Sequence, residues 1–297
     1  MLDRRSALLR IAVVAGAPIF SGCAELSPGY PERDTPRETA MAWPADKPRT
    51  ALVLGSGGPR GFAHVGVLKV LAAAGIEPTL VVGSSAGAIM GALYAARVPI
   101  DAIEQRALSL GLTDIADPAL LKPNRLIGRA LQNVVNDMVG GRRIEDLPLR
   151  FCAVAVPVGA TKLVAFSAGD TGAAVRASSA LPSIFLPTQI GDTLFEDGDL
   201  VSPVPIDVAR TLGATRIVAV DVSAWREDEP ANGHESWKRR DAERRAIIER
   251  EAVGATYFHR VRLPYYAGAS RAYRENVIGL AAEQTKAALE SIRAALL

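Results

Sequence analysis

Two short apolar runs, at residues 51–54 and 79–82, each lead through glycine-rich sequence into a helical pattern, at 59–74 and 86–96 respectively. Strand, glycine turn and helix in succession favour parallel strands, because each connecting helix packs on a face of the sheet. The remaining elements follow the same pattern, with β-rich runs at 151–156, 162–166, 214–220 and 257–263 and helical sequence at 101–138 and 271–297. The sequence therefore predicts an α/β fold with a mainly parallel sheet covered on both faces.

The charge balance limits the classes of function. Among 297 residues, 34 Lys and Arg stand against 32 Asp and Glu, for a net charge of +2. This gives no sustained positive field that could neutralise many phosphates, which argues against nucleic acid as a partner. Cys23 and Cys152 are too few for a disulfide framework and lack the spacing of a zinc site. Residues 226–251 mix acidic and basic side chains, which is typical of a solvated helix face.

The N-terminus has the layout of a bacterial secretory signal. Basic residues precede an unbroken apolar run at 11–20, and two small residues then lead into Cys23. A membrane-spanning helix needs about 20 apolar residues, so this run is too short for a span. The pattern resembles a lipobox, with Phe20 where Leu is usual, and predicts a signal peptide at 1–22 and lipid on Cys23. A buried N-terminal helix is the alternative.

The predicted lipoprotein is expected to be exported and anchored to a membrane. Arg4 and Arg5 resemble the pair of a twin-arginine export signal, although Ala7 stands where Phe or Leu is usual, so the export route stays open. Ala24 and Glu25 lack the Asp that commonly retains lipoproteins at the inner membrane. In a host with two membranes, the localisation prediction therefore extends to the periplasmic face of the outer membrane.

The segment after the cysteine is predicted to be a tether. Prolines recur through 24–49 among charged and small residues, without a helix or strand period. A flexible chain of that length spans about 30 Å. Residues 23–49 are thus expected to be the lipidated cysteine and a flexible tether, and the folded domain to occupy residues 50–297.

Residues 83–87 form a Gly-x-Ser-x-Gly motif at the junction of a predicted strand and helix. Such a turn forces the central serine into a strained backbone conformation and needs neighbours without side chains, here Gly83 and Gly87. Ser85 is thereby held at a helix N-terminus with its hydroxyl exposed for attack. From the pentapeptide alone, a turn that only joins a strand to a helix is equally possible.

A second glycine-rich turn, at 55–61, also lies between a strand and a helix. Consecutive backbone N–H groups there can point at one anion, either a phosphate or an oxyanion. A dinucleotide fingerprint fails because Arg60 occupies the position of its third glycine, and no Gly-Lys-Ser/Thr follows for a P-loop. The anion bound by this loop is therefore expected to be one that forms during a reaction.

The acidic turn at 196–199 contains a candidate base, Asp197. A serine hydroxyl needs a base to take its proton, and an Asp can serve where burial raises its basicity. His64 is expected either to orient the glycine loop or to pack, while His234 lies in the charged segment and His259 in the last strand. On its own, the turn is also compatible with an acidic loop that has no catalytic role.

Together these elements resemble the bacterial patatin-like phospholipases. Residues 56–61, Ser-Gly-Gly-Pro-Arg-Gly, look like the family's Gly-Gly-Gly-x-Arg-Gly oxyanion loop, and 83–87 look like its nucleophile elbow. Residues 197–199, Asp-Gly-Asp, are similar to its Asp-Gly-Gly/Ala motif, and 177–182, Ala-Ser-Ser-Ala-Leu-Pro, to its Ala-Ser-x-Ala-x-Pro stretch. The four blocks occur in family order, and the resemblance covers about residues 50–212.

Two positions depart from the family pattern. Ser56 replaces the first glycine of the loop, where a backbone N–H is still supplied. Asp199 replaces the small third residue of the Asp motif and adds a carboxylate beside the proposed base.

The resemblance implies a three-layer α/β/α sandwich and a serine acyl-ester hydrolase, similar to a phospholipase or lysophospholipase, that works through an acyl-enzyme. Ser85 would attack the ester and Asp197 would accept its proton, with the oxyanion held by the amides of Gly57 and Gly58. The supporting positions are Ser56, Arg60 and Gly61 in the loop and Gly198 and Asp199 in the Asp motif. The implied partners are a phospholipid or other acyl-ester lipid and a membrane surface, reached through the lipid anchor; no metal or organic cofactor is required.

Two alternative functions compete with this one. An α/β-hydrolase would use Ser85 with His234 or His259 in a Ser-His-Asp triad. A lipid-binding or scaffold lipoprotein would keep the fold without turnover. Hydrolysis of a short acyl ester would separate the enzymes from the scaffold.

Overall fold

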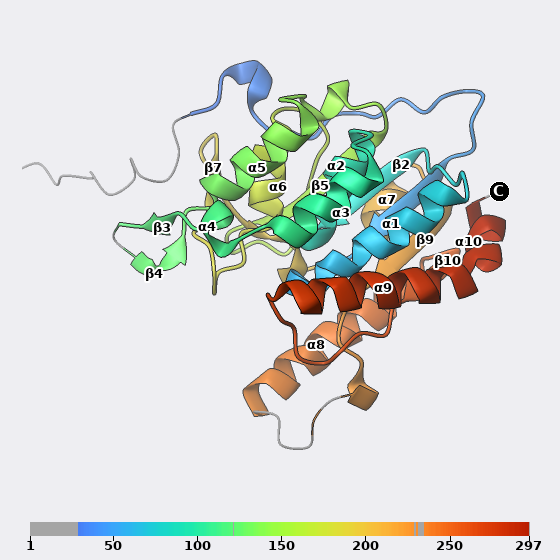
Figure 1. The fold of residues 1–297 in the computed structure, drawn as a ribbon. Helices are drawn as coiled ribbons and strands as arrows, with labels where there is room; N and C mark the ends of the chain where they lie inside the picture. The colour runs from blue at the N-terminus through green and yellow to red at the C-terminus, as the bar shows by residue number, and fades with distance from the viewer. Residues whose placement is uncertain (1–28, 121, 229, 231–234, 297) are drawn as a thin grey trace, which may run out of the picture.

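An eight-stranded mixed sheet lies at the centre of the computed structural model, which describes residues 29–120, 122–228, 230 and 235–296 (Figure 1). The strands are β1 (Thr50–Leu54), β2 (Leu80–Ser84), β5 (Arg150–Pro157), β6 (Val164–Phe166), β7 (Thr188–Ile190), β8 (Thr193–Asp197), β9 (Arg216–Asp221) and β10 (Tyr257–Arg260). Their order is β10-β9-β1-β2-β5-β8-β7, with β6 also paired to β5. The five strands from β10 to β5 are parallel, whereas β6, β7 and β8 pair antiparallel. The prediction of a mainly parallel sheet is confirmed.

Helices cover both faces of this sheet (Figure 1). They are α1 (Ala63–Ala73), α2 (Ala86–Ala95), α3 (Ile100–Ser109), α4 (Leu112–Ile115), α5 (Arg129–Val139), α6 (Thr171–Ser178), α7 (Ile206–Thr211), α8 (Glu235–Ala252), α9 (Arg271–Ala287) and α10 (Leu289–Leu296). Side chains alternate along β1, so Leu52 and Leu54 join the core cluster that includes residues of α1, α2 and α9. Ala51 and Val53 face the other cluster, which includes residues of α7 and α8. The three-layer α/β/α sandwich is therefore also confirmed.

The predicted helical stretch at 101–138 is interrupted by a two-stranded hairpin, β3 (Pro118–Ala119) and β4 (Lys122–Leu126). Proline lacks an N–H and disfavours helical geometry in the residue before it, so Pro118 and Pro123 prevent one continuous helix. The Leu126 N–H donates to the Ile184 carbonyl at 2.8 Å, which joins the hairpin to the loop that follows α6.

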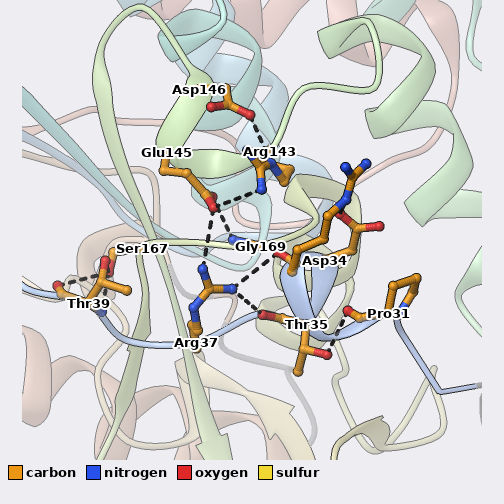
Figure 2. A network of polar contacts seen from close by, with 11 residues as sticks. Pro31, Asp34, Thr35, Arg37, Thr39, Arg143, Glu145, Asp146, Ser167 and Gly169 are labelled. Carbon is orange, nitrogen blue, oxygen red and sulfur yellow. Dashed lines mark hydrogen bonds and ion pairs between the residues drawn. The ribbon is translucent and has the colours of Figure 1, made fainter.

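Residues 29–49, expected to belong to a flexible tether, lie against the domain instead. Figure 2 shows Arg37 beside Glu145, with 3.5 Å between the guanidinium and the carboxylate, and Thr39 beside Ser167. The Thr39 N–H donates to the Ser167 hydroxyl at 2.8 Å, and the Trp43 indole N–H donates to a carbonyl at the end of α7 at 2.7 Å. The tether prediction omitted these side-chain anchors, which hold an irregular, proline-rich backbone on a folded surface.

Among the residues that the structure describes, no helix is both long enough and apolar enough to cross a bilayer. The predicted signal peptide at 1–22 and Cys23 lie outside the described residues. Their assignment therefore stays a prediction.

Candidate active site

Ser85 occupies a tight turn between β2 and α2. Its φ of 53° and ψ of −122° are unusual for a residue with a side chain and cost on the order of 1–3 kcal/mol. Glycine is required on both sides, because a Cβ on Gly87 would lie 2.0 Å from the Leu54 carbonyl oxygen and one on Gly83 only 2.4 Å from the Ala88 Cα. The Ser85 N–H donates to the Ser178 hydroxyl at 3.0 Å. The backbone thus adopts the strained turn that the sequence predicts.

The Ser85 hydroxyl donates a hydrogen bond to Asp197, with 2.7 Å between Oγ and Oδ2. The two residues are 112 positions apart, and the sheet brings them together. Asp197 ends β8 and pairs with Ala155 of β5, while β5 also pairs with β2, which leads into Ser85. The Asp197 N–H donates to the Ala180 carbonyl at 3.2 Å, so the stretch at 177–182 supports both members of the pair.

The environment of Asp197 makes it a stronger base than an ordinary carboxylate. Burial, and next the nearby Asp199 carboxylate, raise the pKa of Asp197 to about 8. The Asp199 N–H, 2.9 Å from Oδ1, the Ser85 hydroxyl and the Arg244 guanidinium oppose this rise. A general base is most effective when its pKa lies near the working pH, so this value suits proton transfer from a serine near neutral pH.

The glycine loop follows β1 and borders the same cavity as Ser85. The Gly55 N–H donates to the Val220 carbonyl at 2.9 Å and the Ser56 N–H to the Pro203 carbonyl at 2.8 Å, which fixes the start of the loop. Gly57 and Gly58 come next and line the cavity with Ser85. Gly58 has a φ of +53°, a left-handed conformation that favours glycine.

Side chains on the following turn support this loop. His64 is fully buried, and burial lowers its pKa to about 4, so the ring is neutral near pH 7. Its Nε2 lies 2.7 Å from the Gly55 carbonyl oxygen, which can only accept, so Nε2 carries the proton and orients the loop. Arg60 donates to the backbone carbonyl of Tyr265. Gly61 packs against Ala86, where a Cβ would come within 2.3 Å of the alanine methyl group.

The sequence gives no local signal for Arg244. It lies on α8, in the charged segment assigned to a solvated helix face, and that interpretation is wrong for this residue. Its Nε donates to Asp199 Oδ1 at 2.7 Å, and its side chain is only 19% exposed. The same helix sends Glu251 to the N–H of Val204 at 3.0 Å. Two polar departures from the family motifs, Ser56 and Asp199, were the only hint that a further polar partner exists.

Ser85 lines one cavity, and a second cavity lies beside it. The first, of about 390 Å³, is lined by Ser85, Asp197, Gly57, Gly58 and residues of α8, Arg244 among them. The second, of about 90 Å³, lies among α2, α3 and α5, and most of its lining is apolar, including Met90, Leu131 and Val135. Gly58 lines both cavities, and Ala86, the residue after Ser85, lines the second. The polar cavity at Ser85 therefore borders a small apolar cavity.

His259 is hydrogen-bonded to α9 and not to the Ser85–Asp197 pair. Its Nε2 lies 2.9 Å from the hydroxyl oxygen of Thr285, which itself donates to the Ala281 carbonyl, so the imidazole donates its proton to α9. His234 lies outside the described residues. Within the part of the chain that is described, the Ser85 hydroxyl is hydrogen-bonded to a carboxylate, as in a Ser-Asp pair, and His259 does not form the triad.

The sequence and the fold of this chain are similar to those of known proteins. Residues 52–210 match the family described as patatin-like phospholipase. The chain belongs to this family. Its fold is similar to that of VipD from Legionella pneumophila, with a TM-score of 0.53 and 13% sequence identity over 87% of this chain and 70% of VipD.

Relatives within the family come from bacteria and animals. An uncharacterized NTE family protein of Mycobacterium tuberculosis is 35% identical over 208 residues, which cover 69% of this chain and 55% of that protein. Patatin-like phospholipase domain-containing protein 6 of Homo sapiens is 34% identical over 183 residues, covering 59% of this chain and 13% of the human protein. The chain therefore spans about half the length of the mycobacterial relative and a small part of the human one.

Proposed function

We propose that this patatin-like chain is a serine acyl-ester hydrolase that acts on lipids, of the phospholipase or lysophospholipase type. The observation that carries the proposal is the 2.7 Å hydrogen bond from the Ser85 hydroxyl to a buried carboxylate, Asp197, at the edge of a cavity. A nucleophile with an adjacent base of suitable pKa is what acyl transfer requires. Membership of a family described as phospholipases supports a lipid ester as the substrate.

The proposed reaction has two halves. Ser85 Oγ attacks the acyl carbonyl while its proton passes to Asp197 Oδ2, and the amides of Gly57 and Gly58 hold the oxyanion. Asp197 then returns the proton to the leaving alcohol as the ester bond breaks, which leaves an acyl-enzyme. In the second half, water gives a proton to Asp197 and attacks the acyl carbonyl. Ser85 recovers its proton from Asp197 as the fatty acid departs. Each oxyanion donor is typically worth about 3 kcal/mol of transition-state stabilisation.

The apolar cavity beside the elbow supports an acyl chain as the group transferred to Ser85. Gly58 and Ala86 line it, and both lie close to the point where the acyl part of a substrate attached to Ser85 would begin. Burying a methylene group stabilises a complex by about 0.8 kcal/mol, so even a short chain segment gains affinity there. The larger cavity, with its polar lining, is left for the alcohol part of the ester.

The decisive test compares the native protein with Ser85→Ala and Asp197→Asn, using a short-chain acyl ester and labelling by a fluorophosphonate. Both variants are expected to lose nearly all turnover, and Ser85→Ala also loses the label. Ser84→Ala is the matched control, because the Ser84 hydroxyl donates to the Ser202 carbonyl at 3.3 Å and not to the reacting pair. Native protein without turnover or label would favour a lipid-binding scaffold, and substantial activity in folded Ser85→Ala would reject the nucleophile.

We further propose that the protein is an exported lipoprotein anchored through Cys23. The support is the basic start, the apolar run at 11–20 and the lone cysteine after two small residues. Several acyl chains on one cysteine hold a protein firmly on a membrane, whereas one chain binds only marginally. Metabolic labelling with a fatty-acid analogue should mark the native protein and not Cys23→Ala. Equal labelling of the two would overturn the lipoprotein assignment and leave the hydrolase proposal unaffected.

A further inference from the structure

The two departures from the family motifs contact each other. The Ser56 hydroxyl, in the glycine loop, donates a hydrogen bond to the Asp199 carboxylate, in the turn after β8. The two positions are 143 residues apart. A glycine at 56 or a small residue at 199 would remove this bond, so the two substitutions form one structural unit. That unit adjoins the reaction site, since the Asp199 N–H also binds Asp197.

Arg244 completes the unit and joins three loops at one edge of the sheet. Its Nε donates to Asp199 Oδ1 at 2.7 Å, and its Nη2 donates to the Ser56 hydroxyl at 2.5 Å and the Ser56 carbonyl at 3.2 Å. Its Nη1 donates to the hydroxyl of Ser223, in the loop after β9. One planar guanidinium thus holds the glycine loop, the Asp turn and the β9 loop in one arrangement.

The unit also determines how much negative charge surrounds the base. Asp199 lies two residues from Asp197, and an uncompensated carboxylate there would oppose ionisation of the base. Arg244 pairs with that carboxylate in a largely desolvated position, where a charge–charge interaction is stronger than at the surface. Arg244 thereby lowers the pKa of Asp197, which burial and Asp199 raise.

The charged groups around this unit come from several elements. Asp199 and Arg244 act directly on the charge of Asp197. Arg244 is in turn influenced by Asp221 at the end of β9 and by Asp241 one turn earlier on α8. Glu251 lies further along α8 and also interacts with Arg244, and Arg60, at the end of the glycine loop, faces Arg244 as a like charge. Asp199 is the carboxylate that both pairs with Arg244 and raises the pKa of Asp197, so it is the one that Arg244 must neutralise.

We propose that Arg244 is a positioning residue of the hydrolytic site: it neutralises Asp199 and fixes the glycine loop, so that Asp197 acts as the base and Gly57 and Gly58 stay oriented toward the oxyanion. This role rests on the proposed function of the Ser85–Asp197 pair. It deepens that function, because it assigns a task to α8 and explains why Ser56 and Asp199 occur together in this chain.

The test is the pH dependence of kcat/KM for a short-chain ester, measured on the full chain. Arg244→Gln leaves Asp199 unneutralised, so the acidic limb should move to higher pH by about one unit, with about a tenfold loss of kcat/KM at pH 7. Asp199→Ala should move the limb to lower pH, because the opposing carboxylate is gone. The double variant Asp199→Ala/Arg244→Gln should return the limb toward the native position. Arg250→Gln, an exposed arginine on the same helix, is the matched control.

Two further variants separate charge from geometry. Arg244→Lys keeps the charge but not the set of four donated bonds, so its limb should stay near the native position while kcat falls. If Arg244 had only a structural role, its replacement would lower activity equally at every pH. The proposal would be overturned if the acidic limb did not move, or if it moved in the same direction in Arg244→Gln and in Asp199→Ala. If Arg244→Gln does not fold, the shift in Asp199→Ala decides. The role of Arg244 alone would be overturned if the native protein hydrolysed the ester and were labelled at Ser85 but the variants kept the native pH profile. A native protein without activity would overturn both proposals.

Discussion

Replacing Asp197 by Asn is expected to change the pH dependence of stability as well as to abolish hydrolysis. The folded protein raises the pKa of this carboxyl from 3.8 to about 8, mainly through burial. Between those two pH values the folded state keeps the proton and the unfolded state releases it. The contribution of Asp197 to the free energy of unfolding is therefore fully present below pH 3.8 and is lost as the pH rises to about 8. The loss is about 1.4 kcal/mol per pH unit.

Asparagine does not titrate, so the variant lacks this loss. From pH 5.5 to 7.5, the free energy of unfolding of Asp197→Asn should gain about 2 to 3 kcal/mol relative to the native protein. Urea denaturation followed by circular dichroism at pH 5.5, 6.5 and 7.5 measures the difference, which cancels the contributions of other titrating groups. Asp192→Asn, on the exposed turn between β7 and β8, makes the same chemical change outside the cavity. A difference that is constant or shrinks with pH would refute the assignment of Asp197 as a buried base.

Two other predictions test the packing around the elbow. Gly87→Ala should destabilise the protein by roughly 3 kcal/mol or prevent folding, because the added Cβ meets the Leu54 carbonyl. Gly279→Ala, a control in α9 with open space around the added Cβ, should be neutral or stabilise the protein by up to about 1 kcal/mol. Thermal melts of the two variants measure both effects. Val134→Phe, which adds volume at the apolar cavity, should raise KM at least fivefold for a long-chain ester and leave a short-chain ester unchanged; an equal effect on both esters would show that the cavity does not hold the acyl chain.

The features that could be predicted from the sequence are those that local chemistry determines. A strand that runs into Gly-x-Ser-x-Gly and then a helix leaves few conformations for the backbone, and Ser85 adopts the strained one expected. The short apolar runs and the glycine turns that lead from them into helices were enough to predict a mainly parallel sheet. By contrast, the contact between Ser85 and Asp197 depends on β8 pairing antiparallel with β5. No spacing in the sequence encodes that pairing, so the family motif was needed to suggest it.

The missed features depend on long-range packing. Along α8 the charges follow no pattern that separates Arg244, which enters the cavity, from the exposed Arg250 on the same helix. The hairpin of β3 and β4 is short and rich in charged residues and proline, so it lacks the apolar alternation by which strands are recognised. Residues 29–49 were expected to be free because their composition resembles that of linkers, but composition does not reveal partners such as Ser167 for Thr39.

Tyr30, whose hydroxyl donates to the Gln132 side chain at 3.0 Å, is held on the domain and limits how far the domain can move from an anchor at Cys23. Only residues 24–29 separate the two, and a fully extended chain covers at most about 3.5 Å per residue, so the reach is at most about 25 Å. A lipid on Cys23 would therefore hold the edge of the domain where this segment enters close to the bilayer. The proposed hydrolysis would then be directed at lipids of the membrane that carries the anchor.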